Sequence, residues 1–446
     1  MADLQELAQA AIEAAIEGEQ VEAFAQDSRK TEVKARGGEV EGLEFSESSG
    51  VGVRVIRDQR MGYAWVSDPS VEEVARAVET ARENATFATA DEFNRLPVRS
   101  EVPDAIPEIF RESLDVASTD EKVALALELE RLAVSRDPRV TKLEEAQYGD
   151  SISRVAIAST QGPAVSYSRT DCWVAAVTLA EEDGETQVGF DFRLAHEPSE
   201  LDVEACAGEA VDRAARLLGA AKPPTAKVPV ILDPHAAASF LGVVSQALTA
   251  EAVQKGRSLF AGSMNEAVAS PSVSIIDDGR MLEGPGAAPF DDEGVATGRT
   301  PLVVSGVLEA FLHNTYTALR GSEASTGNAS RGSYKGSPGV SPSNLFIEAG
   351  DDDLAALLAR AEGGVLIQDV SGIHSGTNPI SGEFSVGATG LRIRAGEIAE
   401  PLREMTIAST VPEMLKAVVA CGRDFRFFSS VGCPSLLIGE MTVAGL

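Results

Sequence analysis

The first part of the chain changes from a helical to a strand-like pattern of apolar positions. Leu4, Leu7, Ala8, Ala11 and Ala15 recur three or four residues apart, which predicts an amphipathic helix. Runs of apolar and alternating residues then predict five strands, over 21–26, 31–35, 41–46, 50–57 and 62–67. A capped second helix is predicted after them, because an acidic Pro-Ser step at 68–70 precedes a helical apolar pattern up to residue 85.

A second copy of this order follows. A helix is predicted over 119–135, and five strands over 140–146, 153–159, 164–168, 173–180 and 186–192. Glu197-Pro198-Ser199 then leads into a helix that carries Cys206 and Ala210. We interpret the two units as an internal duplication, although a shared order of elements without shared residues could also arise by coincidence.

The rest of the chain is rich in glycine and in short strands. Proline-containing stretches at 99–109 and 220–227 predict joints on either side of the second unit. Beyond them we expect an antiparallel domain with few helices, the helices lying at 236–250, 351–361 and 411–420. The predicted fold class is α+β, with duplicated helix–antiparallel sheet–helix units followed by a β-rich barrel- or sandwich-like C-terminal domain. The predicted domains are 1–98, 110–221 and 226–446.

The charge of the chain limits its partners. The formal net charge is −31. A DNA or RNA backbone is bound through a basic surface that releases counterions, so nucleic acid is not expected as a direct partner. An anionic membrane surface is disfavoured for the same reason. The sequence has no run of about 18 apolar residues, so no transmembrane helix is expected.

The cysteines and the first residues indicate a reducing compartment. The chain has four cysteines, and none of them form a CxxC pair, so a disulfide framework is not expected in a chain of this size. Residues 1–20 include Glu6, Glu13 and Glu17 and lack the basic and apolar stretches of a secretory signal. We therefore expect a cytoplasmic protein.

The histidines do not predict a zinc site. A hydrolytic zinc ion usually has three protein ligands and one open position. His196 is followed by Glu197, but Pro198 prevents the helical HExxH arrangement, and we expect His196 in a surface loop. His235 begins a predicted helix, and the residues after it, 236–240, offer no strong ligand.

Nucleophilic catalysis is equally unsupported. No GxSxG motif is present, and His374 and Ser375 would point to opposite faces if they lay on a strand. Cys433 could be a thiol nucleophile, but a buried structural cysteine is far more common. We therefore predict no catalytic residue and no metal ligand in this chain.

Two segments are unusually rich in glycine, serine and asparagine, over 325–332 and 372–385. Such loops let another backbone approach closely, and a strand edge there could bind a peptide or a subunit. The alternative is a pair of structural connections in a β domain. The candidate peptide-binding or subunit-interface residues are Asn328, Arg331, His374, Ser375, Asn378, Ser381 and Ser385.

Several short motifs together resemble the TldD/PmbA family over nearly the whole chain. They are Gly52-Val53-Arg54-Val55, Gly62-Tyr63-Ala64, Asp277-Asp278-Gly279, the FDDEGV run at 290–295, Gly306-Val307-Leu308, Thr326-Gly327-Asn328, the SGEFSVGA run at 381–388 and Gly396-Glu397-Ile398. In that family the TldD branch has an HExxxH zinc motif at the start of the last domain and a late cysteine. The matching stretch here, 235–240, reads HAAASF and lacks the Glu and the second His, and Pro434 follows Cys433.

This pattern resembles the PmbA/TldE branch, and the resemblance implies a function. It implies a non-catalytic partner subunit of a TldD/TldE-type metallopeptidase complex that cleaves unfolded or leader peptides. The expected partners are a TldD-like subunit and an extended peptide, with a homodimer possible when the chain is alone. No cofactor is expected in this chain, and zinc is expected only in the partner. An independent hydrolase with an unrecognised site, or a peptide-binding scaffold, stays open.

Overall fold

A six-stranded antiparallel sheet extends along the molecule in the computed structural model, which describes residues 3–445. Its strand order is β3-β2-β1-β4-β5-β6. The strands are β1 (Gln20–Arg36), β2 (Glu39–Arg57), β3 (Arg60–Ser67), β4 (Val140–Ser159), β5 (Gly162–Glu182) and β6 (Glu185–Ala195). Each N-terminal unit supplies three of them, and β1 and β4 pair at the centre, from Glu22 opposite Ser159 to Ala35 opposite Ala146.

The predicted duplication is confirmed, but the predicted strand count is wrong. Each unit has three long strands where five short ones were expected. The polar stretches that suggested breaks, such as Asp27 to Lys30 in β1, are continuous strand. They separate two hydrophobic clusters on the same strand, with Val21 and Ala23 in one and Val33 in the other. A polar interval in a strand can therefore mark the gap between two cores, where no turn is present.

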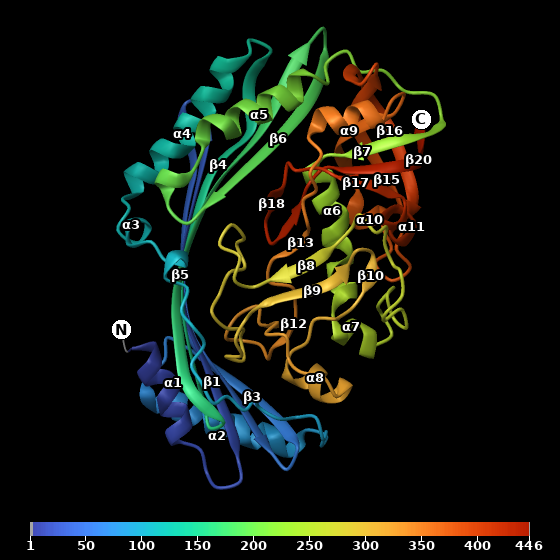
Figure 1. The fold of residues 1–446 in the computed structure, drawn as a ribbon. Coiled ribbons are helices and arrows are strands. Elements are labelled where there is room, and N and C mark those ends of the chain that lie inside the picture. The colour runs from blue at the N-terminus through green and yellow to red at the C-terminus, as the bar shows by residue number, and fades with distance from the viewer. Residues whose placement is uncertain (1–2, 446) are drawn as a thin grey trace.

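All four long helices of these units cover one face of the sheet (Figure 1). Helices α1 (Leu4–Glu13) and α2 (Val71–Phe87) pack over one half, and α4 (Thr119–Arg136) and α5 (Val203–Ala215) over the other. Val21 is buried under α1 and α2, and Val33 is buried under α4 and α5. Both lie on β1 an even number of positions apart, so they share one face of the sheet. The segment between the units forms η1 (Pro107–Ile109) and α3 (Glu112–Asp115), and η2 (Pro198–Glu200) precedes α5.

The C-terminal region contains a closed five-stranded barrel, which confirms the barrel-like prediction. Its strands are β7 (Ala226–Leu232), β14 (Val365–Ser371), β15 (Glu383–Arg394), β16 (Glu397–Thr410) and β20 (Leu436–Gly445). The barrel closes because β16 pairs with both β15 and β20. It is not wholly antiparallel, since β7 and β14 run parallel. Strand β17 (Val418–Cys421) adds to β20.

A second sheet packs against this barrel in a shared hydrophobic core. Its order is β10 (Val307–Leu308), β9 (Arg299–Val304), β8 (Ile275–Asp278), β13 (Leu345–Ile347), β19 (Val431–Cys433) and β18 (Arg426–Phe428). A small ladder joins β11 (Ala329–Ser330) to β12 (Gly339–Val340). The helices are α6 (Pro234–Val244), η3 (Ser245–Leu248), α7 (Ala250–Gln254), α8 (Thr315–Gly321), α9 (Leu354–Arg360), α10 (Ile373–Gly376) and α11 (Val411–Lys416).

Two predicted helices end earlier than expected. The helix predicted over 236–250 breaks after Val244, and the one predicted over 411–420 stops at Lys416, where the chain continues into β17. Apolar residues at 418–421 satisfy both a helical and a strand pattern, and pairing with β20 decides between them. None of the helices within residues 3–445 has the length and apolar character needed to cross a membrane.

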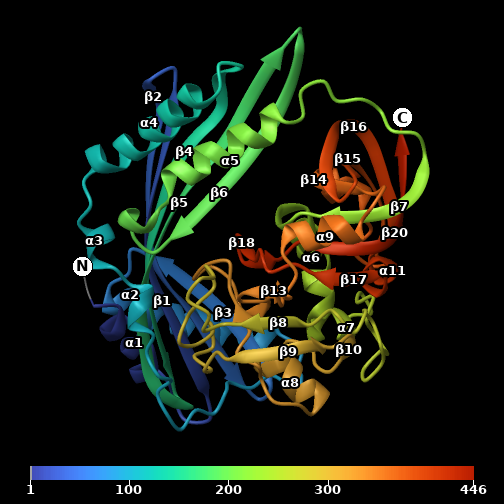
Figure 2. The same ribbon diagram turned by 45° about the horizontal axis from the view of Figure 1, so that its top comes forward.

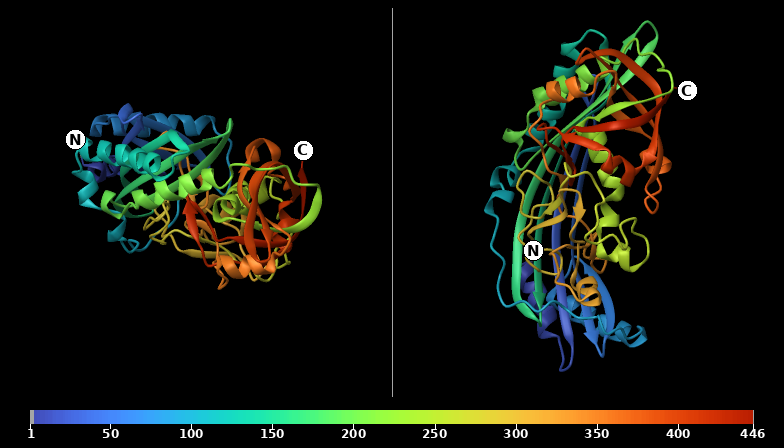
Figure 3. Two further views of the ribbon diagram at one scale, coloured as in Figure 1. Left: turned by 90° about the horizontal axis from the view of Figure 1, so that it is seen from above. Right: turned by 45° about the vertical axis from the view of Figure 1, so that its right-hand side comes forward.

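The long sheet curves around the C-terminal region and faces it with the side that carries no helices. Figures 1 and 2 show the helices on the outer side and the C-terminal strands on the inner side, and Figure 3 shows the same arrangement from above and obliquely. Phe24 and Val165 from the inner side of the sheet pack with Phe290 and Tyr334 of the C-terminal region. Any space between the two parts is therefore lined by residues far apart in the sequence.

Candidate functional site

Helix α6 places His235 at the boundary between the barrel and the long sheet. Strand β7 ends at Leu232, and Asp233 then caps the helix, accepting a hydrogen bond from the backbone N–H of Ala236 at 2.9 Å. Pro234 occupies the first turn, where a missing N–H costs nothing. The local sequence therefore fixes where the helix begins and brings His235 out of the barrel wall.

His235 lies between two phenylalanine rings. The centroid of its ring is 5.0 Å from that of Phe190 on β6 and 5.0 Å from that of Phe428 on β18. Its Nδ1 lies 3.5 Å from Oδ1 of Asp369. Burial lowers the pKa of His235, so the imidazole is neutral at neutral pH. It contributes an aromatic surface more than a charge.

A cavity of about 560 Å³ opens beside this histidine. Its walls come from β6 on one side and from α6, α10 and the β18–β19 turn on the other, and Figures 1 and 2 show these elements facing each other. The polar groups are few, and the lining residues are Phe190, Phe192, His235, Ala238, Ser239, Gly242, Val243, Ile373, His374, Phe428, Ser429 and Val431. A mostly apolar cavity with a few polar groups is the usual form of a binding site.

An ion pair holds the two walls together. Nη2 of Arg426 on β18 donates to Oδ1 of Asp191 at 2.8 Å and to the carbonyl oxygen of Phe192 at 2.9 Å. Asp191 is almost fully buried, and Arg193 contacts its other oxygen at 2.7 Å. Phe192 follows Asp191 directly, and Phe428 lies two residues after Arg426. The ion pair between Arg426 and Asp191 therefore fixes the two aromatic walls relative to each other.

The residues around His235 do not fit a zinc site. The next helix positions that could supply a base and a second ligand are occupied by Ala236 and Phe240, both buried, and Phe240 packs on Phe384 at 4.7 Å between ring centroids. Cys433 is fully buried, and burial raises the pKa of its thiol. Within residues 3–445, no group of three or more His, Cys, Asp or Glu side chains is arranged to hold a metal ion.

Comparison with known proteins decides the family. Residues 21–85, 112–218 and 225–445 match, in that order, domain 1, the central domain and the C-terminal domain of the PmbA/TldA metallopeptidases. This chain belongs to the PmbA/TldD family. The resemblance read from the sequence motifs is thereby confirmed.

Similar proteins of the PmbA/TldD family include named metalloproteases. Metalloprotease PmbA of Escherichia coli O157:H7 is 27% identical over 416 residues, covering 93% of this chain and 89% of that protein. A metalloprotease of Methanothermobacter thermautotrophicus is 28% identical over 407 residues, covering 90% and 87%.

Solved structures share the whole fold. A Thermotoga maritima protein described as a candidate modulator of a DNA gyrase superposes with a TM-score of 0.91 at 27% identity, covering 98% of both chains. TldE from Thermococcus kodakarensis superposes with a TM-score of 0.89 at 23% identity, covering 98% of this chain and 99% of that one. The second similarity shows the fold alone.

The structure places one of the seven predicted site residues at the cavity. His374, on α10, lines it. Four other candidates follow His374 in the sequence but are exposed and do not line the cavity: Ser375, Asn378, Ser381 and Ser385. The peptide or subunit contacts predicted for these residues stay predictions. The expectation that His374 and Ser375 lie on a strand is wrong, since both lie in α10.

Strand addition at the 372–385 segment stays a prediction. Strand β15 begins in this segment, at Glu383. It pairs with β16 on one side, from Glu383 opposite Thr410, and with β14 on the other, up to Gly387 opposite Ser371. Asn378 stabilises the local turn, since its Oδ1 accepts from the backbone N–H groups of Ile380 at 2.9 Å and Ser381 at 3.2 Å.

Asn328 and Arg331 are held inside the chain. Nδ2 of Asn328 donates to Oδ2 of Asp277 at 2.7 Å, and burial raises the pKa of that carboxyl to about 6. The guanidinium of Arg331 pairs with Glu22 of β1 and lies 5.0 Å over the ring of Phe24. Asn328 therefore bonds within the C-terminal region, whereas Arg331 connects that region to the long sheet. The sequence could not show this, because Glu22 and Arg331 are remote in the chain.

His196 is buried, so its predicted place in a surface loop is wrong. Its Nδ1 lies 2.8 Å from the carbonyl oxygen of Thr170, and its Nε2 lies 3.0 Å from that of Leu282. The sequence predicts the turn that carries His196, but it does not show that the C-terminal loop at Leu282 packs over this residue.

The residues missed by the sequence analysis are the aromatic ones. Phe190, Phe192 and Phe428 form the cavity walls, and none was a candidate. A signal existed for two of them. Phe190 and Phe192 alternate within a predicted strand, so they share one face, in a chain with only 5% aromatic residues.

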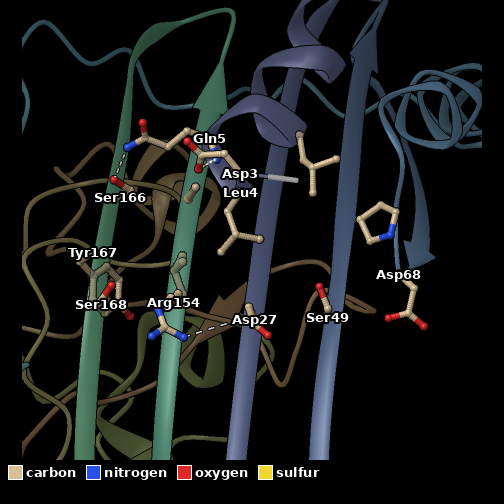
Figure 4. A pocket seen from close by; sticks show the side chains of 14 residues that line it. Asp3, Leu4, Gln5, Asp27, Ser49, Asp68, Arg154, Ser166, Tyr167 and Ser168 are labelled. Atoms are coloured by element: carbon tan, nitrogen blue, oxygen red, sulfur yellow. Dashed lines mark hydrogen bonds and ion pairs between the residues drawn. The ribbon is translucent and has the colours of Figure 1, made fainter. Parts of the chain in front are cut away.

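A larger cavity, of about 700 Å³, lies elsewhere, on the outer face of the long sheet next to α1 (Figure 4). Arg154 is its only arginine, and it pairs with Asp27 at 3.7 Å and Asp115 at 2.7 Å. Gln5 hydrogen-bonds to Ser166 across the same cavity. Tyr167 is the one aromatic residue among its lining residues, so it offers less aromatic surface to a ligand than the cavity beside His235.

Proposed function

We propose that this chain is the non-catalytic subunit of a TldD/TldE-type metallopeptidase complex that cleaves unfolded or leader peptides. One observation carries the proposal. At the start of α6, where the resemblance places the zinc motif of the TldD branch, the chain has Ala236 and Phe240 in an aromatic environment. Without ligands and a general base, a chain cannot bind and activate a zinc-bound water.

The division of labour follows from the chemistry. The TldD-like subunit supplies zinc, its ligands and the base, whereas this chain supplies structure and a surface for the peptide. Similarity to proteins named metalloproteases supports membership of a peptidase system, and the resemblance of the 235–240 stretch to the PmbA/TldE branch supports the partner role.

Reconstitution tests this proposal. The chain is purified alone and mixed with the HExxxH-bearing family member from the same cells, and cleavage of an unstructured peptide is measured. We expect no cleavage by the lone chain and chelator-sensitive cleavage by the mixture. A mixture in which the Glu of the partner's HExxxH is replaced by Gln should be inactive while the complex still forms.

Two results would contradict the proposal. The first is strong chelator-sensitive cleavage by this chain alone. The second is a partner that forms no complex with this chain and gains no activity from it.

A further inference from the structure

We propose that the cavity beside His235 binds an aromatic side chain of an extended, basic peptide. This inference rests on the proposed function for the peptide nature of the ligand and goes beyond it by naming the side chain and the charge that are recognised. It is carried by three features: the aromatic walls of the cavity, its place at a sheet edge, and the carboxylate of Asp369, which contacts the lining residue His235.

Aromatic residues gather here although the chain has few of them. They make up 5% of the sequence, yet Phe190, Phe192 and Phe428 all line this one cavity. The aromatic surface continues along the sheet, because the ring of Trp173 on β5 lies 5.8 Å from that of Phe192. The neutral ring of His235 stacks between two of the phenylalanines. Such walls favour another aromatic ring through offset or edge contacts.

The size and place of the cavity suit one side chain of an extended peptide. Its volume of about 560 Å³ lies within the range of about 300–1,000 Å³ typical of ligand sites. Strand β6, which provides one wall, ends the six-stranded sheet, and no further strand pairs with it within residues 3–445. Val188, on the same side of β6 as Phe190, is half exposed. A peptide can therefore reach the cavity along this edge without displacing a strand.

The carboxylate of Asp369, next to His235, favours a basic peptide. Asp369 is 52% exposed at its side chain, and its one ion-pair contact among the described residues is the 3.5 Å approach to His235. Burial raises the pKa of this carboxyl, and the neutral imidazole beside it supplies no compensating charge, so a cationic group of a ligand would stabilise the ionised carboxylate. The net charge of −31 acts in the same direction and raises the local concentration of cationic peptides.

Peptide titrations test the inference directly. Replacing Trp65, which lies in the first unit next to Tyr334, by the Trp65→Phe substitution leaves Trp173 as the only tryptophan, because the chain has two. Trp173 fluorescence then reports binding next to Phe192. The probes are three acetylated, amidated nonapeptides: a central Phe flanked by Lys and Gly, the same peptide with Ala for Phe, and the same peptide with Glu for Lys.

We expect the Phe–Lys peptide to bind about tenfold or more tightly than the Ala–Lys peptide, since burial of one aromatic ring corresponds to at least that ratio. The Phe–Glu peptide should bind more weakly than the Phe–Lys peptide, with the difference shrinking as salt is added. Equal binding of the Phe and Ala peptides, or no binding of any peptide, would overturn the aromatic site. Equal binding of the Lys and Glu peptides would overturn the role of the charge.

A pair of matched variants locates the site. Phe428→Ala removes a cavity wall and should reduce Phe–Lys affinity about tenfold while leaving Ala–Lys binding unchanged. Phe87→Ala removes a ring that is 88% exposed on α2 and should change neither. If Phe428→Ala stays folded and binds the Phe peptide as the parent does, the cavity is not the site. Reconstitution with the zinc-bearing partner is measured separately, so failure of this site and failure of the proposed function give different results.

Discussion

His196 shows how one residue joins two parts of the molecule. Both of its ring nitrogens face carbonyl oxygens, one on β5 and one on the C-terminal loop at Leu282. A neutral imidazole can donate from only one nitrogen, whereas the protonated ring donates from both. The Asp171 carboxylate, whose Oδ1 lies 3.5 Å from Nδ1, raises the pKa of His196 by accepting a hydrogen bond from the ring. Arg169 pairs with the same carboxylate, and Glu200 accepts a hydrogen bond from the backbone N–H of His196. Below its raised pKa, the protonated ring can donate to both carbonyl oxygens and so bridge the two parts.

This geometry predicts a pH dependence of stability. A folded pKa raised above the unfolded value of about 6.5 means that the stabilisation is complete below that pH and is lost as pH rises through the folded value. His196→Asn should therefore lower the free energy of unfolding more at pH 6 than at pH 9. Urea denaturation of both proteins across this range measures the difference. A gap between parent and variant that does not change with pH would contradict the protonated bridge.

At the scale of elements, two glycines allow helices to pack closely on the long sheet. Gly62 on β3 faces α2, and a Cβ there would overlap the carbonyl oxygen of Ala81. Gly189 on β6 faces α5 in the second unit, and a Cβ there would overlap the carbonyl oxygen of Ala210. The two glycines therefore have the same function in the two copies of the duplicated unit.

Adding one methyl group at either glycine should be destabilising. Gly62→Ala and Gly189→Ala should each reduce the free energy of unfolding by about 1–3 kcal/mol, the usual cost of overpacking. Gly332→Ala is the matched control, because nothing lies within 4 Å of a Cβ at that position. Urea denaturation compares the three variants. Equal stability of all of them would show that the helices can shift outward at no cost.

How far the sequence predicts the elements depends on whether their determinants are local. The helix after Ser70 was predictable, because the capping box between Ser70 and Glu73 is a sequence motif. The length of β1 was not, because its polar middle looks like a turn until two separate helix pairs are known to cover its ends. For the same reason, α6 could be placed from the sequence, but the phenylalanines of β6 and β18 that face His235 could not.

At the scale of the whole molecule, a buried charge network joins the long sheet to the C-terminal region. Nη2 of Arg54 on β2 lies 2.9 Å from Glu22 of β1 and 2.9 Å from Glu293 of the C-terminal region, and all three side chains are buried. Arg331 completes the network through Glu22. The pairing of these remote charges therefore fixes how the two parts meet.

Breaking this network should cost far more than breaking a surface pair. Arg54→Met leaves Glu293 buried without its ion-pair partner and Glu22 paired with Arg331 alone, and it should lower the free energy of unfolding by about 3–5 kcal/mol. Arg76→Met removes a pair with Glu73 on exposed α2 and should cost no more than about 1 kcal/mol. Calorimetry or urea denaturation compares the two. Similar losses in both variants would contradict the structural role of the buried network.

Zinc content tests the central claim most directly. The chain is purified without chelators and analysed for metal, together with an HExxxH-bearing family member as a positive control. Because Ala236 and Phe240 occupy positions that offer no ligand, we predict far less than one zinc ion per chain, even after incubation with zinc and removal of the excess. About one tightly bound zinc per chain would contradict the assignment of this protein as the non-catalytic subunit.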